Sequence, residues 1–136
     1  MSMIYFDTDV LVNFFVEQSR EKHELAGRIY ENASKKGSVF MSFLVLQELS
    51  FVLAKLNMPM SEVRDNVNAL ALLKPYSYQT GEYYRAVNLA ERVGFQHFND
   101  CLHTAISERH CDELITFNKA DFSKIQLHTN LKITLL

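Results

Sequence analysis

Residues 3–12 read MIYFDTDVLV, and this stretch decides the kind of fold that the chain can adopt. Its apolar start predicts a buried strand over Met3–Asp7. A short helix is expected from Thr8 to Phe15, with Thr8 or Asp9 able to cap its N-terminus. The two carboxylates of this stretch therefore lie beside a buried element, where an uncompensated charge is costly and a bound cation would offset the cost.

The remaining sequence continues this alternation of strands and helices. Gly37 marks the end of the second helix, and Ser61 and Thr80 are expected to cap two later helices. The alternation predicts an α/β fold in which helices cover both faces of a parallel sheet. Further helices are expected over residues 19–36, 43–56, 61–73, 80–93 and 99–110, further strands over 39–42, 75–78, 113–116 and 132–135, and a turn over 118–122.

Length and composition restrict the class of protein. With 136 residues, of which 48% are hydrophobic, the chain can bury a core, and we expect residues 1–136 to form a single domain. The apolar runs are too short to cross a bilayer, and the N-terminus lacks the basic start of a signal peptide. Cys101 and Cys111 form no CxxC pair, which suits a reducing cytosol, so we expect a cytoplasmic protein with no membrane partner.

The formal net charge of −2 provides no global basic footprint of the kind that many nucleic-acid-binding proteins carry. An acidic metal site would itself lower the net charge, so this value does not exclude an RNA substrate. Basic residues do gather locally, at Arg28 with Lys35 and Lys36, at Arg85 with Arg92, and at Lys119 with Lys124.

Four acidic residues accompany the predicted buried elements: Asp7, Glu48, Asp100 and Asp121. Asp7 and Asp121 follow predicted strands, and ligands of parallel α/β sheets bind beyond the carboxyl ends of the strands. Glu48 shares the face of an apolar helix with hydrophobic neighbours one turn away. Asp100 lies in the first turn of another helix.

Each acid also has an ordinary structural interpretation. Asp7 can cap a helix, Glu48 can reach water from a helix edge, and Asp121 is a common turn residue. Asp100 complements the dipole of its helix without any chemistry. Together, however, the acids predict a carboxylate-rich site that suits Mg²⁺ or Mn²⁺.

Zinc is disfavoured, because the cysteines and histidines lack the spacing of zinc ligands. His97 and His103 are expected to be surface or hydrogen-bonding residues. Asp9 adds a second carboxylate near Asp7, and Thr104 lies one turn after Asp100 as a supporting hydroxyl.

Four short motifs, in this order, resemble those of the PIN-domain nucleases, and among them the VapC-type toxins of toxin–antitoxin pairs. The resemblance runs from residue 3 to about residue 136. Asp9 departs from it, since an Asn is usual there, and so does His103, where a small or aliphatic residue is common. The motifs are IYFDTDVLV at residues 4–12, QEL at 47–49 after a strand ending in Ser42, NDCLHTA at 99–105 and LITFNKADF at 114–122.

The resemblance implies a PIN-like three-layer α/β/α sandwich around a central, mainly parallel sheet of four to five strands. It implies a Mg²⁺- or Mn²⁺-dependent endoribonuclease that hydrolyses RNA phosphodiester bonds, and it also implies a homodimer and an antitoxin protein whose tail blocks the site. The acids Asp7, Glu48, Asp100 and Asp121 would bind metal and activate water, with support from Thr8, Asp9, Thr116 and Asn118.

In this mechanistic hypothesis Asp7, Asp100 and Asp121 hold a cation, and Glu48 completes the cluster directly or through water. Without metal the carboxylates should repel one another, which would raise some of their pKa values.

Two other functions stay open on the sequence. A HAD-like phosphatase also has two aspartates two residues apart after a strand, so that Asp7 would be the nucleophile and Asp9 the general acid. Against this, Leu11 stands where that motif prefers Thr or Val. A catalytically inactive PIN-fold binding module would keep the fold and act by contact alone.

Overall fold

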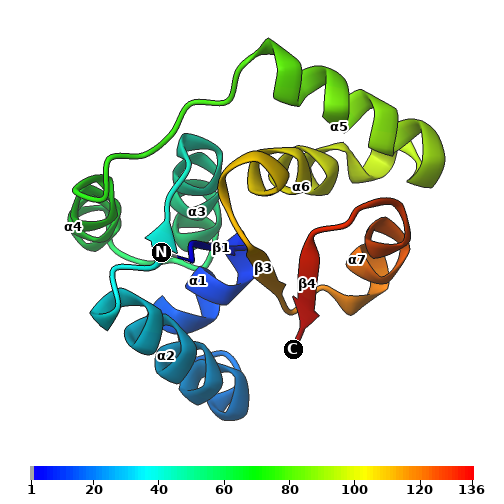
Figure 1. Ribbon diagram of the computed structural model, residues 1–136. Coiled ribbons are helices and arrows are strands. Elements are labelled where there is room, and N and C mark those ends of the chain that lie inside the picture. The colour runs from blue at the N-terminus through cyan, green and yellow to red at the C-terminus, as the bar shows by residue number, and fades with distance from the viewer. Residues whose placement is uncertain (1) are drawn as a thin grey trace.

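The computed structural model describes residues 2–136, and a four-stranded sheet in the order β2-β1-β3-β4 lies at its centre (Figure 1). Every neighbouring pair of strands is parallel. The α/β fold with a central parallel sheet, predicted from the alternation of elements, is thereby confirmed. The strands are β1 (Ile4–Phe6), β2 (Val39–Phe40), β3 (Glu113–Thr116) and β4 (Lys132–Leu135).

Helices flank the sheet on both sides (Figure 1). α1 (Thr8–Phe15) packs against α2 (Arg20–Lys35) on one side. α5 (Thr80–Val93) and α6 (Phe98–His110) pack against each other on the other side, and α7 (Lys119–Ile125) lies beside β4. Connections between parallel strands are right-handed, so the direction in which the chain moves across the sheet decides which face its helices cover. The chain moves one way from β1 to β2 and the other way from β2 to β3, and the helices of these two connections therefore lie on opposite faces.

α3 (Phe43–Lys55) packs against both α1 and α4 (Met60–Ala71), so it joins the two layers near the sheet edge formed by β2. The side chains of Leu49 and Leu53 are fully buried there. Because α1 and α3 are in contact, the start of α1 and the middle of α3 can present side chains to one common region.

The central strand β1 is buried on both of its faces. Tyr5 and Phe6, which point to opposite faces of the sheet, are 0% and 1% exposed. A continuous apolar run is typical of a parallel strand covered by helices on both sides. The polar residues begin only where β1 ends, at Asp7, so the carboxyl edge of the sheet is the first place at which this segment can carry chemistry.

Two predicted elements are wrong. Residues 75–78 do not form a strand: Tyr76 makes only an isolated bridge with Ser42, beyond the end of the two-residue strand β2. Residues 118–122 are not a simple turn, because α7 begins at Lys119. The Oδ1 atom of Asn118 accepts a hydrogen bond of 3.2 Å from the Asp121 N–H and thereby caps this helix.

Three predicted helix caps are displaced by one or two residues. The N-cap of α1 is Asp7, whose side chain accepts from the Thr8 N–H, so neither Thr8 nor Asp9 fills that role. Pro59 precedes α4 in place of Ser61, and Gln79 precedes α5 in place of Thr80. The predicted end of α2 is confirmed, since Gly37 adopts a φ of 65° just after the helix.

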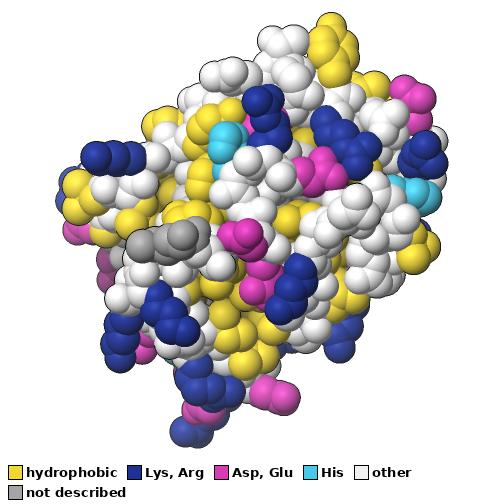
Figure 2. All heavy atoms as spheres, viewed as in Figure 1, with side chains coloured by type: hydrophobic (Ala, Val, Ile, Leu, Met, Phe, Trp, Pro, Cys, Tyr) yellow, Lys and Arg dark blue, Asp and Glu magenta, His cyan; other side chains and the backbone are white. Residues whose placement is uncertain are grey.

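The surface carries mixed charge on the face shown in Figure 2, where Lys and Arg side chains are interspersed with Asp and Glu. This mixture agrees with the formal net charge of −2. Among residues 2–136, no helix is both long enough and apolar enough to span a membrane.

Candidate functional site

A cleft of about 570 Å³ opens where β1 ends, between the starts of α1 and α6 and the middle of α3. Three of the predicted acids, Asp7, Glu48 and Asp100, line it together with Asp9. Asp121 joins them through Asp100: one carboxylate oxygen of each, with a ring nitrogen of His97, lie within 4.8 Å of one another. The fold therefore brings to one place all four acids that the sequence singled out.

Asp7 is held by both of its carboxylate oxygens. Oδ1 accepts a hydrogen bond of 2.8 Å from the Thr8 N–H, and Oδ2 accepts one of 2.7 Å from the Thr116 hydroxyl at the end of β3. The residue is only 5% exposed, and burial raises the pKa of its carboxyl above the ordinary value despite these hydrogen bonds. Asp7 is therefore both a helix cap and a rigidly placed buried acid.

Asp9 faces the same strand end from the first turn of α1. Its carboxylate accepts a hydrogen bond of 3.3 Å from the Phe117 N–H and approaches the Thr116 hydroxyl at 3.5 Å. Burial, reinforced by the charge of Asp7, raises the pKa of Asp9 to about 7. Asp9 thus lies beside Asp7 and adds a second acid to this end of the cleft.

Asp100 and Asp121 approach each other from α6 and α7. Burial, and then the negative charge of Asp7, raise the pKa of Asp100 to about 7. Asp121 has a lowered pKa, chiefly because the Asn118 side-chain amide donates to it at 2.9 Å. The interaction between the two carboxyl groups contributes to the raised pKa of Asp100 and to the lowered pKa of Asp121.

His97 belongs to this cluster, which the sequence analysis did not foresee. Its Nδ1 lies 3.4 Å from Asp121 Oδ1, and its side chain is only 12% exposed, so of the expected surface or hydrogen-bonding roles it is the polar contact that the structure supports. The residue ends a short 3₁₀ turn, η1 (Phe95–His97), directly before α6. The three-residue spacing from His97 to Asp100 is one helical turn and is the signal that could have revealed it.

Glu48 reaches the cleft from α3 and is held by donors from two other helices. Its Oε1 accepts from the Thr8 hydroxyl at 2.6 Å and from His103 Nε2 at 2.7 Å, and its Oε2 accepts from the Asn99 amide at 3.0 Å. Burial alone would raise the pKa of Glu48, but these hydrogen bonds, led by that from His103, lower it below the ordinary value. The surroundings of Glu48 therefore favour its ionised form.

The expected rise in pKa without metal is confirmed for some of the acids. The pKa values of Asp7 and Asp100 are raised, and burial is the largest cause for both. Repulsion by Asp7 is the second cause for Asp100, whereas repulsion by Glu48 is only a small cause for Asp7. Glu48 and Asp121 shift in the opposite direction, because side-chain donors outweigh both burial and repulsion.

The supporting hydroxyls differ in what they contact. Thr8 and Thr116 donate directly to carboxylates of the cleft. The Thr104 hydroxyl instead donates at 2.8 Å to the backbone carbonyl of Asp100, one turn earlier in α6. Thr104 therefore contacts the helix that carries Asp100 rather than its carboxylate.

The donor set fits a hard divalent cation. Carboxylate oxygens are the ligands that Mg²⁺ and Mn²⁺ prefer, and donor atoms of Asp100, Asp121 and His97 lie within 4.8 Å of one another. Burial and the charge of Asp7 raise the pKa of Asp100, so negative groups are gathered here at a cost. The His97 nitrogen is an additional donor that Mn²⁺ accepts more readily than Mg²⁺. A cation bound here would offset the cost of burying these acids.

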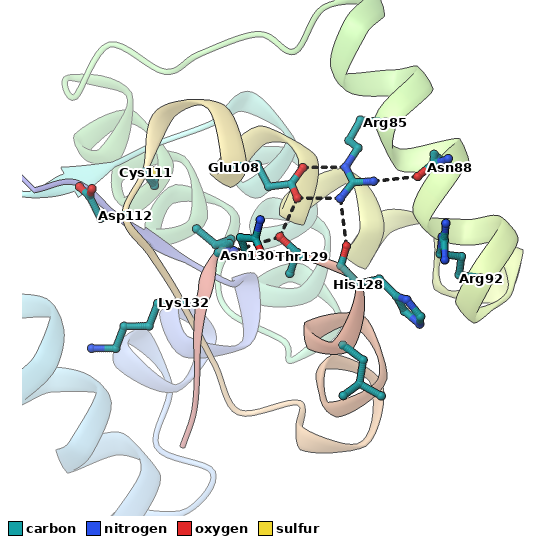
Figure 3. A pocket seen from close by; sticks show the side chains of 12 residues that line it. Arg85, Asn88, Arg92, Glu108, Cys111, Asp112, His128, Thr129, Asn130 and Lys132 are labelled. Carbon is teal, nitrogen blue, oxygen red and sulfur yellow. Dashed lines mark hydrogen bonds and ion pairs between the residues drawn. The ribbon is translucent and has the colours of Figure 1, made fainter.

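A second cavity, of about 740 Å³, lies between α5, α6 and the segment before β4 (Figure 3). None of the four acids lines it. The Arg85 guanidinium donates to both oxygens of Glu108, at 2.8 and 2.9 Å, and also to the Asn88 side chain and the His128 carbonyl. Thr129 donates to Glu108 as well, so these groups satisfy one another and connect α5 and α6 to the segment before β4.

Comparison with known proteins agrees with this geometry. Of the solved structures, a chain of the VapBC2 complex from Rickettsia felis, bound to a DNA fragment from their promoter, is similar with a TM-score of 0.69 and 18% sequence identity. The alignment covers 98% of this chain and 99% of that one, which shows a shared fold. No curated protein matches the sequence. The model of the PIN domain matches residues 4–126, the range that holds every acid of the cleft, and the chain therefore belongs to the PIN-domain family.

Proposed function

We propose that this protein is a metal-dependent endoribonuclease that hydrolyses RNA phosphodiester bonds with Mg²⁺ or Mn²⁺. One observation carries the proposal: donor atoms of Asp100, Asp121 and His97 lie within 4.8 Å of one another, at the border of a cleft that Asp7 and Glu48 also line. Burial raises the pKa values of Asp7 and Asp100, and a divalent cation that also binds phosphate would stabilise their ionised forms.

In this proposal Asp7, Asp100 and Asp121 hold the cation, and Glu48 completes the cluster directly or through water. A divalent cation in this place supplies Lewis acidity, which lowers the pKa of water and offsets charge on the phosphodiester. Thr8 and Thr116 fix the orientation of Asp7, and Asn118 fixes that of Asp121. Asp9 adds negative charge next to Asp7, which we expect to strengthen cation binding.

We further propose that the protein is the toxin of a toxin–antitoxin pair. The similarity in fold to a chain of a VapBC2 complex, over 98% of this chain, supports this role. In this proposal residues 1–136 form a single cytoplasmic nuclease domain, the protein is a homodimer, and an antitoxin protein blocks the cleft. Expression of the protein should then arrest growth, and co-expression of the short open reading frame next to its gene should restore growth.

The alternatives differ in what they predict for Asp7. A HAD-like phosphatase would form a phospho-aspartate on Asp7, whereas the nuclease forms no covalent intermediate. The PIN-domain match over residues 4–126 favours the nuclease. A binding module without activity would keep its biological effect when the acids are changed to amides.

The decisive experiment is cleavage of a pool of structured RNAs by the purified, antitoxin-free protein with Mg²⁺, with Mn²⁺ and with EDTA. Asp100→Asn should abolish cleavage, because it removes a charge from the cluster at almost constant volume. Asp65→Asn is the matched control, since this exposed aspartate pairs only with Arg64 on α4 and should leave cleavage unchanged.

Cleavage that requires the metal and is lost only in Asp100→Asn would establish the nuclease. Cleavage that persists in EDTA or in Asp100→Asn would refute the assignment of the site. If the protein neither cuts the RNA pool nor binds Mn²⁺, the binding module becomes the better description.

A further inference from the structure

The buried side chain of His103 connects the cleft to the interior of the sheet. It is 1% exposed and lies on the face of α6 that packs toward β1, so the expectation that it is a surface residue is wrong and the alternative, a hydrogen-bonding residue, is confirmed. Nδ1 lies 2.6 Å from the Tyr5 hydroxyl, and Nε2 lies 2.7 Å from Glu48 Oε1. Both ring nitrogens are therefore engaged, one with the sheet and one with an acid of the cleft.

The chain of contacts continues beyond Tyr5. The Tyr5 hydroxyl also lies 2.9 Å from Ser42 Oγ, and Ser42 Oγ accepts the Val45 N–H at the start of α3. The result is an uninterrupted hydrogen-bonded path from Ser42 through Tyr5 and His103 to Glu48. Because Ser42 caps the helix that carries Glu48, both ends of the path are attached to α3.

The direction of the last hydrogen bond follows from the role proposed for Glu48. A carboxylate that binds a cation is ionised and can only accept, so His103 Nε2 must carry the hydrogen and donate it. Tyr5 can then donate to Nδ1 while it accepts from Ser42, which satisfies every polar atom of the path. A charge-assisted hydrogen bond of this kind restricts the orientation of a carboxylate more strongly than a neutral one does.

Resting on the proposed function, we propose that His103, supported by Tyr5, is a positioning residue that orients the Glu48 carboxylate for the bound cation. Groups behind a metal ligand fix its rotamer, and their loss weakens metal affinity by about 10–100-fold in other proteins. His103 Nε2 and the Thr8 hydroxyl occupy Oε1 of Glu48, while Oε2 accepts only from Asn99, an exposed residue. Oε2 is therefore the oxygen that remains for the cation or its water.

The test measures Mn²⁺ affinity directly: the protein is titrated with Mn²⁺, and free Mn²⁺ is measured by electron paramagnetic resonance. His103→Leu introduces an apolar side chain of similar bulk and removes the donor, and it should weaken Mn²⁺ binding by about 10–100-fold. His103→Gln retains an N–H donor and should recover a measurable part of the affinity. Tyr5→Phe, which removes only the supporting hydroxyl, should have a smaller effect in the same direction.

A double-mutant cycle separates positioning from packing. In a Glu48→Gln background, His103→Leu should have no further effect on Mn²⁺ affinity, because His103 acts only through Glu48. Folding is checked by thermal unfolding of each variant without metal. The matched control is His110→Gln, at the other end of α6. His110 lies 3.3 Å from Glu82 of α5 and is not among the residues that line the cleft, so this change should leave Mn²⁺ affinity unchanged.

The outcomes distinguish this inference from the proposed function. If His103→Leu and Tyr5→Phe bind Mn²⁺ as tightly as the wild type while Asp100→Asn has lost binding, the positioning role is refuted and the proposed metal site is supported. Equal losses from His103→Leu with and without Glu48→Gln would also refute it. If Asp100→Asn retains full affinity, the metal site itself is wrong and this inference falls with it.

Discussion

The Thr116 hydroxyl donates a hydrogen bond of 2.7 Å to Asp7 Oδ2, although the two residues are 109 positions apart in the chain. The bond exists because β1 and β3 are neighbouring parallel strands whose carboxyl ends meet at one edge of the sheet. It places an acid of the first motif against the segment that leads to Asp121. The cleft is thus built across a strand pair, and its chemistry depends on that pairing.

The metal-free protein should become less stable as the pH rises from about 4 to about 7. Asp9 and Asp100 have pKa values of about 7 in the folded chain against an ordinary 3.8, so the folded chain binds more protons than the unfolded chain in this range. Glu48 and Asp121 have lowered pKa values and act in the opposite sense, but only below their ordinary values of 4.5 and 3.8. Thermal unfolding in EDTA at several pH values measures how steeply the stability falls with pH.

The double variant Asp9→Asn with Asp100→Asn provides the control for this slope. Because neither position can then titrate, the variant should have a clearly smaller pH dependence between these limits, and the remainder comes from groups such as Asp7, whose pKa is also raised. An unchanged slope would mean that other groups bind the extra protons.

Addition of Mn²⁺ at pH 7.5 should stabilise the protein, because the cation binds only the folded arrangement of the acids. A concentration about 100 times the dissociation constant stabilises by about 2.7 kcal/mol. Asp121→Asn should remove most of this stabilisation, since carboxylate oxygens of Asp121 and Asp100 lie within 4.8 Å of each other and could bind one cation together. The measurement is the midpoint of thermal unfolding with and without Mn²⁺. A full shift in Asp121→Asn would exclude this carboxylate as a ligand.

Asp7→Asn should abolish cleavage and at the same time raise the stability of the metal-free protein. The carboxylate is 5% exposed and has a raised pKa, so removal of its charge relieves a cost of burial. One accepted hydrogen bond is lost, so the net gain should be small, about 1 kcal/mol. Chemical denaturation in EDTA at pH 8 gives the stability, and RNA cleavage gives the activity. Wild-type cleavage by this variant would disprove the site.

Glu108→Gln should destabilise the fold by about 1–2 kcal/mol without affecting Mn²⁺ affinity or cleavage. Glu108 accepts two hydrogen bonds from Arg85 and one from Thr129, and these contacts join α5 and α6 to the segment before β4. Urea denaturation measures the loss, with the exposed Glu62→Gln on α4 as the control. A loss of Mn²⁺ affinity in Glu108→Gln would show that the second cavity is coupled to the cleft.

The sequence alone was sufficient to predict the four parallel strands, with one further strand in error, and to place Asp7 at the carboxyl end of β1 and Asp121 shortly after the end of β3. Apolar runs followed by Asp7 and by the segment before Asp121 are local patterns, and local patterns determine where a strand ends. Hydrophobic spacing likewise predicted that Glu48 belongs to a largely buried helix. The four PIN-like motifs were recognised for the same reason, because each is a short continuous segment.

Only the tertiary structure decided which groups touch these acids. The contact of His103 with Tyr5 of β1 depends on how α6 packs against the sheet, and the contact between His97 and Asp121 depends on how α7 packs against α6. The failure of residues 75–78 to form a strand has the same origin, since a strand needs a partner and β2 ends before Ser42. Local sequence determines elements and their ends, whereas hydrogen bonds between distant residues, and the pKa values that follow from them, exist only once the elements have packed.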